Sequence, residues 1–236
     1  MAQLVVTPLA SSHRFTAGDE LLSHLLEALA QVQLSLEDYD LLVVTSKVVS
    51  KCEGRVVPFD GTAQMREALI IGESRRILRR RGPLHITETH QGFVNANAGI
   101  DFSNTEPNTA VLLPVDSDKS ARALRAQIEH ATGVTIGVVI TDTFGRTWRN
   151  GVADVALGAA GIHVIDDLRG QQDDSGNTLE VTQVAIADEI ASAANLVVAK
   201  DGHTPFVHIR GLATKHFGAS SVAEQILRSA NDDLFR

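Results

Sequence analysis

The spacing of apolar residues along the chain constrains its fold more than any other feature of the sequence. Short runs of Val, Ile and Leu predict strands, and longer stretches with apolar residues every three or four positions predict helices. The strand candidates lie at 4–6, 41–44, 110–113, 134–140, 163–165 and 206–209. Residues 82–110 and 163–181 look like strand and loop with no intervening helix, which breaks the strict alternation of a doubly wound sheet. The pattern therefore predicts an α+β fold that is neither a Rossmann fold nor a P-loop fold.

Several stretches have helical spacing. A leucine stripe over 21–29 follows Asp19, a residue type that commonly caps helices, and Gly133 is placed to end a helix over 118–130. The other predicted helices cover 62–80, 182–197 with Thr182 as the cap, and about 219–230.

The segment 163–181 is the clearest interruption of this pattern. Its polar, glycine-containing part at 166–177 predicts a hairpin or a mobile loop. We expect residues 1–236 to form a single unit of two intertwined α+β subdomains, with this segment at the edge.

The composition narrows the classes of partner. The net charge of −8 argues against nucleic-acid binding, which needs a positive surface. No apolar stretch approaches the ~18 residues that cross a bilayer, and the first residues lack a signal-peptide pattern. We therefore expect a cytoplasmic protein with no nucleic-acid or membrane partner. Cys52 is the only cysteine, so no disulfide framework is possible, and a packed thiol is the expected role.

The strongest candidate for chemistry follows the predicted strand at 134–140. The sequence has no Walker A motif and no G-x-G-x-x-G motif after a strand, so a nucleotide site would be built differently. Asp142 and Thr143 come where that strand is predicted to end, and they offer the hard oxygen ligands that Mg²⁺ and Mn²⁺ prefer. Arg146 and Arg149, three positions apart, are spaced to face one anion. The alternative is an Asx-turn in which Asp142 caps a helix and the arginines pair with surface acids.

Two further clusters are rich in polar groups. The segment 95–104 carries many amide, hydroxyl and carboxylate oxygens, which suits a metal or nucleotide loop and equally an ordinary polar turn. Asp101 together with Asp142 would make a two-carboxylate metal site able to neutralise phosphate charge. The residues Thr45-Ser46-Lys47, with Lys51 further on, suit polyphosphate binding, although lysines at strand ends are more often surface charges.

Three long runs occur in a fixed order along the chain. They are Val-Val-Thr-Ser-Lys-Val-Val-Ser-Lys, Asn-Ala-Gly-Ile-Asp-Phe-Ser-Asn and Ile-Thr-Asp-Thr-Phe-Gly-Arg-Thr-Trp-Arg-Asn-Gly. In these runs the chain resembles the coenzyme F420-0:L-glutamate ligase (F420-0 gamma-glutamyl ligase) family over about residues 3–212, in its stand-alone form without a nitroreductase-like domain. The resemblance implies a two-domain α+β fold that works as a homodimer. It also implies a reaction in which GTP drives amide formation between coenzyme F420-0 and L-glutamate, followed by γ-linked addition of further glutamate.

The resemblance implies roles for individual residues. Asp101, Asp142 and Thr143 correspond to ligands of a divalent metal, Mg²⁺ or Mn²⁺, at two sites, with K⁺ as a further candidate ion. The nucleotide contacts that it implies are Ser12, His13, Arg14, Phe15, Thr45, Ser46, Lys51, Asn104 and Lys200. We expect Lys51 and Arg146 to stabilise the phosphoryl group that is transferred to the substrate carboxylate.

Two other functions use the same residue types. A metal-dependent nucleotide phosphohydrolase would direct the carboxylates at water, and a sensor would bind GTP without turnover. Trp148, Arg149 and His90 are candidates for the deazaflavin and glutamate side of the cleft. The segment 166–177 is a candidate cover that would keep water from an acyl-phosphate intermediate.

Overall fold

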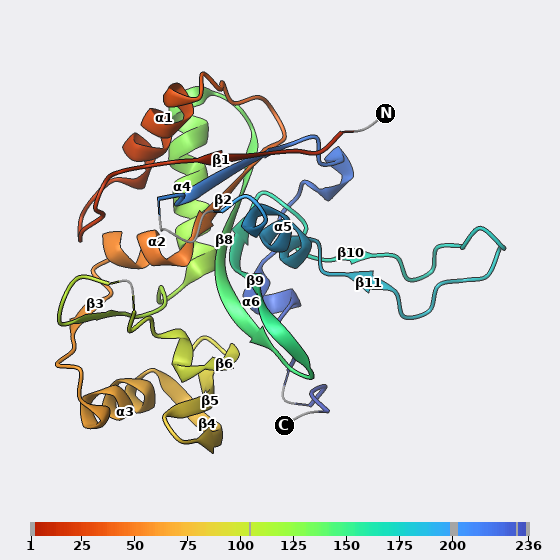
Figure 1. Ribbon diagram of the computed structural model, residues 1–236. Helices are drawn as coiled ribbons and strands as arrows, with labels where there is room; N and C mark the ends of the chain where they lie inside the picture. The colour runs from red at the N-terminus through yellow and green to blue at the C-terminus, as the bar shows by residue number, and fades with distance from the viewer. Residues whose placement is uncertain (1–2, 104, 199–202, 230, 235–236) are drawn as a thin grey trace.

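A five-stranded mixed sheet forms the centre of the molecule in the computed structural model, which describes residues 3–103, 105–198, 203–229 and 231–234 (Figure 1). The strand order is β1-β12-β2-β8-β9, and only β2 and β8 pair in parallel. The strands are β1 (Val5–Leu9), β2 (Asp40–Thr45), β8 (Ile136–Arg146), β9 (Arg149–Ala160) and β12 (Phe206–Arg210).

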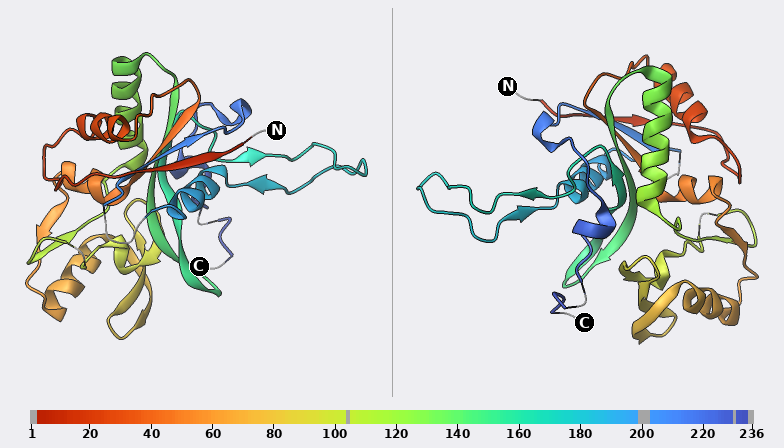
Figure 2. Two further views of the ribbon diagram at one scale, coloured as in Figure 1. Left: turned by 45° about the horizontal axis from the view of Figure 1, so that its top comes forward. Right: turned by 180° about the vertical axis from the view of Figure 1, so that it is seen from behind.

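Helices cover both faces of this sheet. One face carries α1 (Leu21–Gln31), α2 (Ser46–Cys52) and α4 (Ser117–Thr132), and the other carries α5 (Ile186–Asn195) and α6 (Val222–Gln225) (Figures 1 and 2). Successive residues of β2 supply the two cores in turn: Leu42 and Val44 pack with α1 and α4, whereas Leu41 and Val43 pack with α5. Burial of both faces explains why this strand is a continuous apolar run instead of an alternating one.

A smaller group of elements lies between β2 and α4 in the chain and has its own apolar cluster. It contains β3 (Val56–Pro58), α3 (Ala63–Gly72), β4 (Ser74–Arg81), β5 (Leu84–Thr89), β6 (Val94–Ala96), the 3₁₀ turn η1 (Asn97–Gly99) and β7 (Thr109–Val111). Strands β4, β5 and β6 form one antiparallel sheet, and β3 pairs with β7. Phe59, Ile70 and Leu112 are buried at the centre of this group.

The predicted helix at 62–80 is wrong in its second half. Helix α3 begins at a Thr62 cap, whose hydroxyl accepts a hydrogen bond from the Met65 amide, and it ends at Gly72. The arginine-rich stretch that follows is strand β4, which pairs with β5 across a tight turn. Gly82 makes this turn possible because its φ of +56° is in the left-handed region.

Three other helix ends also differ from the sequence prediction. Asp19 does not cap α1, because its carboxylate accepts a hydrogen bond from the Thr16 amide in the preceding loop. Thr182 precedes strand β11 (Gln183–Val184), and α5 begins after it. Within the described part of 219–230, only the short helix α6 forms. The carboxylate of Asp118 accepts hydrogen bonds from the backbone N–H groups of Val222 and Ala223 at the start of this helix. The predicted end of α4 is confirmed, since Gly133 adopts a left-handed φ of +75° there.

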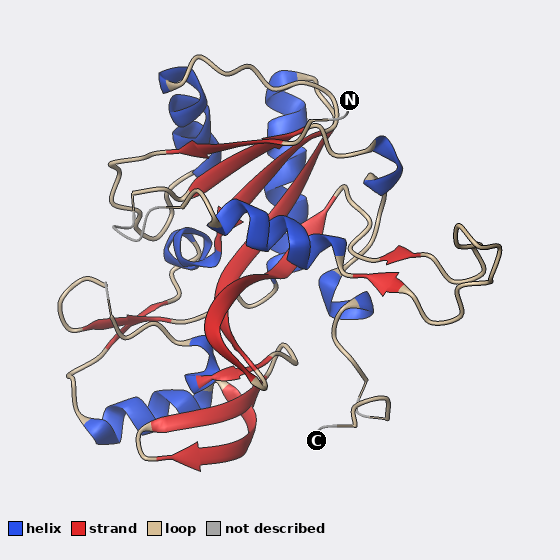
Figure 3. Cartoon of the chain, turned by 45° about the vertical axis from the view of Figure 1, so that its right-hand side comes forward, coloured by secondary structure: helices blue, strands red, loops and turns tan. Residues whose placement is uncertain are grey.

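The segment 163–181 belongs largely to a hairpin that extends outward from the body of the molecule (Figures 1 and 3). Its base is the antiparallel pair β10 (Asp166–Asp167) and β11, and its outer part is a loop closed by a single bridge between Gln172 and Thr178. A 3₁₀ turn, η2 (Thr214–His216), packs near the base, where Lys215 makes an ion pair with Asp166 at 2.9 Å.

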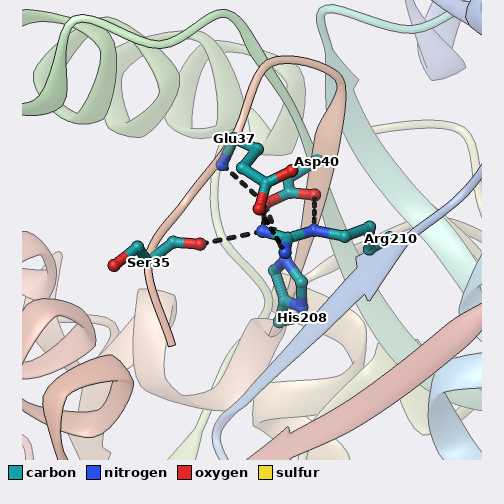
Figure 4. A network of polar contacts seen from close by, with 5 residues as sticks. All are labelled: Ser35, Glu37, Asp40, His208 and Arg210. Atoms are coloured by element: carbon teal, nitrogen blue, oxygen red, sulfur yellow. Dashed lines mark hydrogen bonds and ion pairs between the residues drawn. The ribbon is translucent and has the colours of Figure 1, made fainter. Parts of the chain in front are cut away.

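A buried polar network connects β2 and β12 at the end of the sheet where β2 begins (Figure 4). Arg210 donates hydrogen bonds to both carboxylate oxygens of Asp40, from Nε at 2.8 Å and from Nη2 at 2.7 Å. The His208 Nε2 atom lies 2.8 Å from Asp40 Oδ2, and both side chains are only 1% exposed. The hydrogen bond from Arg210 holds the pKa of Asp40 well below its usual range, against the opposing effect of burial. His208 therefore has a structural role in this network.

No helix in the described part of the chain is long and apolar enough to cross a membrane.

Candidate active site

A cluster of carboxylates forms where β8 continues beyond the end of β2. The parallel pairing of the two strands ends at Thr45 and Thr141, and β8 then runs on with β9 as a curved two-stranded ribbon (Figure 3). Asp142 and Thr143 are thus within a strand and not at its end, so the expected strand end is wrong, and Asp142 caps no helix. Their position is still at the edge of the sheet, because the neighbouring parallel strand stops beside them.

Strand β9 adds a carboxylate that the sequence analysis missed. Asp154 is paired with Thr143 across the ribbon, and the Thr143 hydroxyl donates a hydrogen bond of 2.6 Å to Asp154 Oδ1. Asp154 therefore brings a further hard oxygen ligand to the group of Asp142 and Thr143.

Asp101 reaches the same cluster from the smaller group of elements. Its backbone pairs with Val111 through two hydrogen bonds of 2.9 and 3.0 Å, and the Ser103 amide donates to its carboxylate at 2.9 Å. Lys47, in the first turn of α2, makes an ion pair with the Asp101 carboxylate. The negative charge of Asp101 contributes to the raised pKa of Asp142, which is consistent with the predicted association of the two carboxylates.

The electrostatics of the cluster favour a bound cation. Burial raises the pKa of the Asp142 carboxyl to about 7, and the negative charges of Asp154 and Asp101 act in the same direction. A backbone hydrogen bond from Thr143 and the charge of Lys47 oppose the shift without cancelling it. Because the charges of Asp154 and Asp101 both disfavour ionisation of Asp142, a divalent cation would offset this repulsion.

A pocket lined by cationic and hydroxyl groups adjoins the carboxylates. Ser12, His13, Arg14, Thr45, Lys47 and Lys51 line this pocket. A neighbouring pocket is lined by Thr45, Thr143 and Asp154, and both pockets share Thr45, Thr204 and Pro205. Thr45, itself a predicted nucleotide contact, therefore lines both pockets.

Two of the predicted nucleotide residues have a different role in the packing. Phe15 lines the pocket but is only 7% exposed, and its ring packs edge-on against Phe206 with centroids 6.1 Å apart. Ser46 is buried at the start of α2. Arg14 is exposed, and the nearest acid to its guanidinium is Glu106 at 3.9 Å. The predicted contacts Asn104 and Lys200 lie outside the described residues.

The predicted residues at the far end of the ribbon are not brought to the cluster. Arg146 is four residues along β8 from Asp142, or about 13 Å at ~3.3 Å per residue. Its guanidinium donates to the Asn150 carbonyl oxygen in its own turn at 2.8 Å. Trp148 is 88% exposed in that turn, where Arg149 is also exposed. The His90 Nε2 atom lies 2.9 Å from the Gly72 carbonyl oxygen in the smaller group of elements.

Cys52 is not a candidate nucleophile. Burial raises the pKa of its thiol to about 11, with further contributions from the charges of Asp19 and Glu53. The thiol is therefore protonated at neutral pH and cannot act as a thiolate.

An α+β frame with carboxylates beside a lysine and hydroxyl pocket is the framework of an enzyme site for charged, oxygen-rich ligands. The chain belongs to the F420-0:Gamma-glutamyl ligase family, whose model matches residues 11–211, and the α+β fold predicted from the sequence is confirmed.

Curated relatives match nearly the whole chain. The coenzyme F420:L-glutamate ligase of Methanopyrus kandleri is 38% identical over 99% of this chain and 98% of its own length. The enzyme of the same name from Methanothermobacter thermautotrophicus is 38% identical over 93% of this chain and 94% of its own length. The one from Methanocaldococcus jannaschii is 36% identical over 94% and 93%.

Proposed function

We propose that this chain is a ligase of coenzyme F420 biosynthesis that joins L-glutamate to coenzyme F420-0 at the expense of GTP. The names of the relatives support glutamate ligation in F420 biosynthesis. The single structural observation that carries the proposal is the position of Asp101, Asp142 and Asp154 beside the pocket of Lys47 and Lys51. Such a site suits transfer of a phosphoryl group, which a carboxylate needs before it can react with an amine.

The proposed reaction has two steps. In the first, a carboxylate oxygen of the acceptor forms a bond to the γ-phosphorus of GTP, the bond from that phosphorus to the bridging oxygen breaks, and GDP leaves. In the second, the amine of glutamate forms a bond to the carbonyl carbon of the acyl phosphate, inorganic phosphate leaves and the nitrogen loses a proton. Repetition on the γ-carboxylate of the added glutamate would extend the product.

The carboxylate cluster has the donor set of a Mg²⁺ or Mn²⁺ site. Asp101, Asp142 and Thr143 would hold the cation as predicted, and Asp154 is added as a fourth oxygen donor. The raised pKa of Asp142 fits this role, because a cation favours the ionised form that burial disfavours. When bound, the cation would supply charge neutralisation for the phosphate oxygens during transfer.

The residues of the chain itself bind and orient the substrates. Lys51 lines the pocket from the last turn of α2 and is placed to hold phosphate oxygens as a point charge. Lys47 pairs with Asp101 and so links the cation site to the same pocket. The structure gives no support for the predicted role of Arg146 within one chain, because its guanidinium donates to the Asn150 carbonyl oxygen in its own turn.

Two expectations concern the surroundings of the site, a covering loop and a homodimer. The hairpin that carries β10 and β11 extends outward from the body of the chain, so it gives no support to a cover role of 166–177 within one protomer (Figures 1 and 2). The homodimer stays a prediction, because a single chain is described.

Phosphate release distinguishes the ligase from the two alternatives. We expect GTP-dependent phosphate release only when coenzyme F420-0, glutamate and Mg²⁺ or Mn²⁺ are all present. Asp142→Asn should lower this rate at least about 100-fold, because one cluster carboxylate is lost. Asp174→Asn, which removes an exposed carboxylate from the outer hairpin loop, is the matched control and should have no effect.

Other patterns of phosphate release would contradict the proposal. Release without an acceptor would indicate a phosphohydrolase. GTP binding without any release would indicate a sensor.

A further inference from the structure

Three potential metal ligands gather on the loop between β1 and α1, outside the carboxylate cluster. His13 and Asp19 belong to the loop, and His24 lies one turn into α1. One ligand atom from each of the three side chains lies within 4.8 Å of the other two. The sequence analysis assigned His13 to the nucleotide and gave Asp19 only a capping role, so this grouping is a product of the fold.

The side chains of His13 and Asp19 are already positioned toward one another. His13 Nε2 lies 2.8 Å from Asp19 Oδ2, and the rings of His13 and His24 are stacked with centroids 3.7 Å apart. Asp19 Oδ2 also accepts a hydrogen bond of 2.7 Å from the Thr16 amide, which fixes the carboxylate in the loop. The hydrogen bond with His13 and that from Thr16 hold the pKa of Asp19 below its usual range, so the carboxylate is ionised and available as a ligand.

His24 has an environment that suits a metal-bound imidazole. Its Nδ1 atom is buried without a hydrogen-bond partner in the described part of the chain, and Glu27 Oε2 lies 3.4 Å away. Metal-bound histidines usually have a carboxylate or carbonyl group near the nitrogen that does not bind the metal. With Glu27 in that position, the Nε2 atom of His24 is the natural ligand.

We propose that His13, Asp19 and His24 form a binding site for a divalent transition metal ion of the Zn²⁺ type, distinct from the Asp101 and Asp142 cluster. Two imidazoles and one carboxylate are a donor set found in zinc sites that keep an open position for water. The two imidazoles are borderline ligands, and they favour Zn²⁺ over Mg²⁺.

Binding requires the three ligand atoms, which lie within 4.8 Å of one another, to adjust to tetrahedral spacing. Ligand atoms at ~2.0–2.2 Å from a tetrahedral zinc ion are about 3.3 Å apart. The contact of 2.8 Å between His13 and Asp19 would therefore open by about half an ångström, and the stacked rings would turn apart. His13 is exposed on the loop and free to make this adjustment.

The position of the site gives it a link to the pocket nearby. His13 lines the pocket of Lys47 and Lys51 together with Ser12 and Arg14. An ion that holds His13 against α1 would therefore fix one wall of this pocket. The binding of the ion does not depend on the proposed ligase activity. The two can therefore be tested apart.

The test measures Zn²⁺ affinity of the full chain after chelator treatment, by competition with a chromophoric chelator in the presence of excess Mg²⁺. Asp142→Asn serves as the background, because it weakens the carboxylate cluster as a competing Zn²⁺ site. In this background we expect one equivalent of Zn²⁺ to bind. Addition of His13→Gln or His24→Gln should weaken binding at least about 10-fold, since a ligand is lost. His130→Gln, at an exposed histidine near the end of α4, is the matched control and should leave the affinity unchanged.

A second readout guards against loss of folding in a variant. Co²⁺ bound by the wild-type chain should give the intense visible absorption of a four-coordinate site, and His13→Gln should abolish it while its circular dichroism stays native. Binding of less than one equivalent of Zn²⁺ by the Asp142→Asn chain would overturn the proposal. Equal Zn²⁺ affinity of the His13→Gln, His24→Gln and His130→Gln variants would also overturn it. So would a Co²⁺ spectrum that persists in folded His13→Gln.

Discussion

Replacement of Arg210 by methionine tests the energetic role of the buried network that joins β2 and β12. The substitution removes two hydrogen bonds to Asp40, at 2.8 and 2.7 Å, one to Glu37 at 2.7 Å and one to the Ser35 carbonyl oxygen at 2.8 Å. The Asp40 carboxylate would keep His208 and the Glu37 amide, which donates at 2.8 Å, but would lose its only guanidinium partner among the described residues.

The magnitude follows from the burial of Asp40. Removal of one partner of a buried ion pair costs about 3–5 kcal/mol, because the remaining charge is left without compensation. The Arg210 side chain is 35% exposed, so water could reach part of the vacated space, and we discount the loss to about 2–4 kcal/mol. For a chain of this size, each kcal/mol shifts Tm by ~2–4 °C, which gives a decrease of roughly 4–16 °C.

The assay is urea and thermal unfolding of Arg210→Met at neutral pH, with Arg80→Met as the control. Arg80 makes a surface pair with Glu67 at 3.3 Å, and its loss should cost under about 1 kcal/mol. The pKa of Asp40 is lowered in the folded state, so the network stabilises the fold above the unfolded pKa of about 4 and loses this effect as the pH falls further. The difference between wild type and Arg210→Met should therefore narrow below about pH 4. An Arg210→Met variant no less stable than Arg80→Met would refute the reasoning.

Three further predictions concern the site and the packing beside it. In the presence of a chelator at pH 8, Asp142→Asn should be at least as stable as wild type, because the folded-state pKa of Asp142 is raised to about 7 and its ionisation lowers stability as the pH rises from ~4 through 7. Excess Mg²⁺ or Mn²⁺ should reverse the order of the two Tm values. A variant that is less stable than wild type in chelator at pH 8 would contradict this reasoning. Lys51→Ala should raise the GTP concentration needed for half-maximal rate about 10-fold or more, with Lys119→Ala on exposed α4 surface as the control, and an unchanged GTP dependence would remove Lys51 from the site. Gly158→Ala should lower the free energy of unfolding in urea by about 1–3 kcal/mol or more, because the added Cβ would lie 2.2 Å from the Ser117 carbonyl carbon. A variant with wild-type stability would mean that β9 and α4 do not approach so closely.

Strands β1, β2, β8 and β12 of the central sheet were predictable from their apolar runs, whereas the edge strand β9 was not predicted. The run Leu41–Val44 is too short for a helix and too uniformly apolar for a strand with a solvent-facing side, and the structure buries both of its faces. Gly133 likewise marked the end of α4, since a left-handed residue there is most easily glycine.

Strand β4 could not be found from local preference. Its arginines are good helix formers, and they extend the helical stretch that begins at Thr62. Pairing with β5 decides the outcome, and Arg76 donates a hydrogen bond of 2.7 Å to Glu88 across the two strands. Tertiary pairing of this kind overrides propensity and has no signal in a single segment.

The cluster was partly predictable, and Asp154 shows where the sequence stops being sufficient. Asp142 and Thr143 stand out as polar residues after an apolar run, whereas Asp154 lies within an ordinary mixed segment. A regular β8–β9 hairpin would not pair Asp154 with Thr143. A bulge between Gly145 and Arg146 shifts the register of the two strands and makes this pairing possible. The fold is needed to bring the third carboxylate to the other two.

The measurement that tests the account most directly is mass spectrometry of the products formed from coenzyme F420-0, L-glutamate, GTP and Mg²⁺ or Mn²⁺. We predict a product heavier by one or more glutamyl residues, absent when GTP is omitted and absent with Asp142→Asn. GDP and phosphate formed at full rate with no glutamylated product would contradict the assignment of this site to amide ligation.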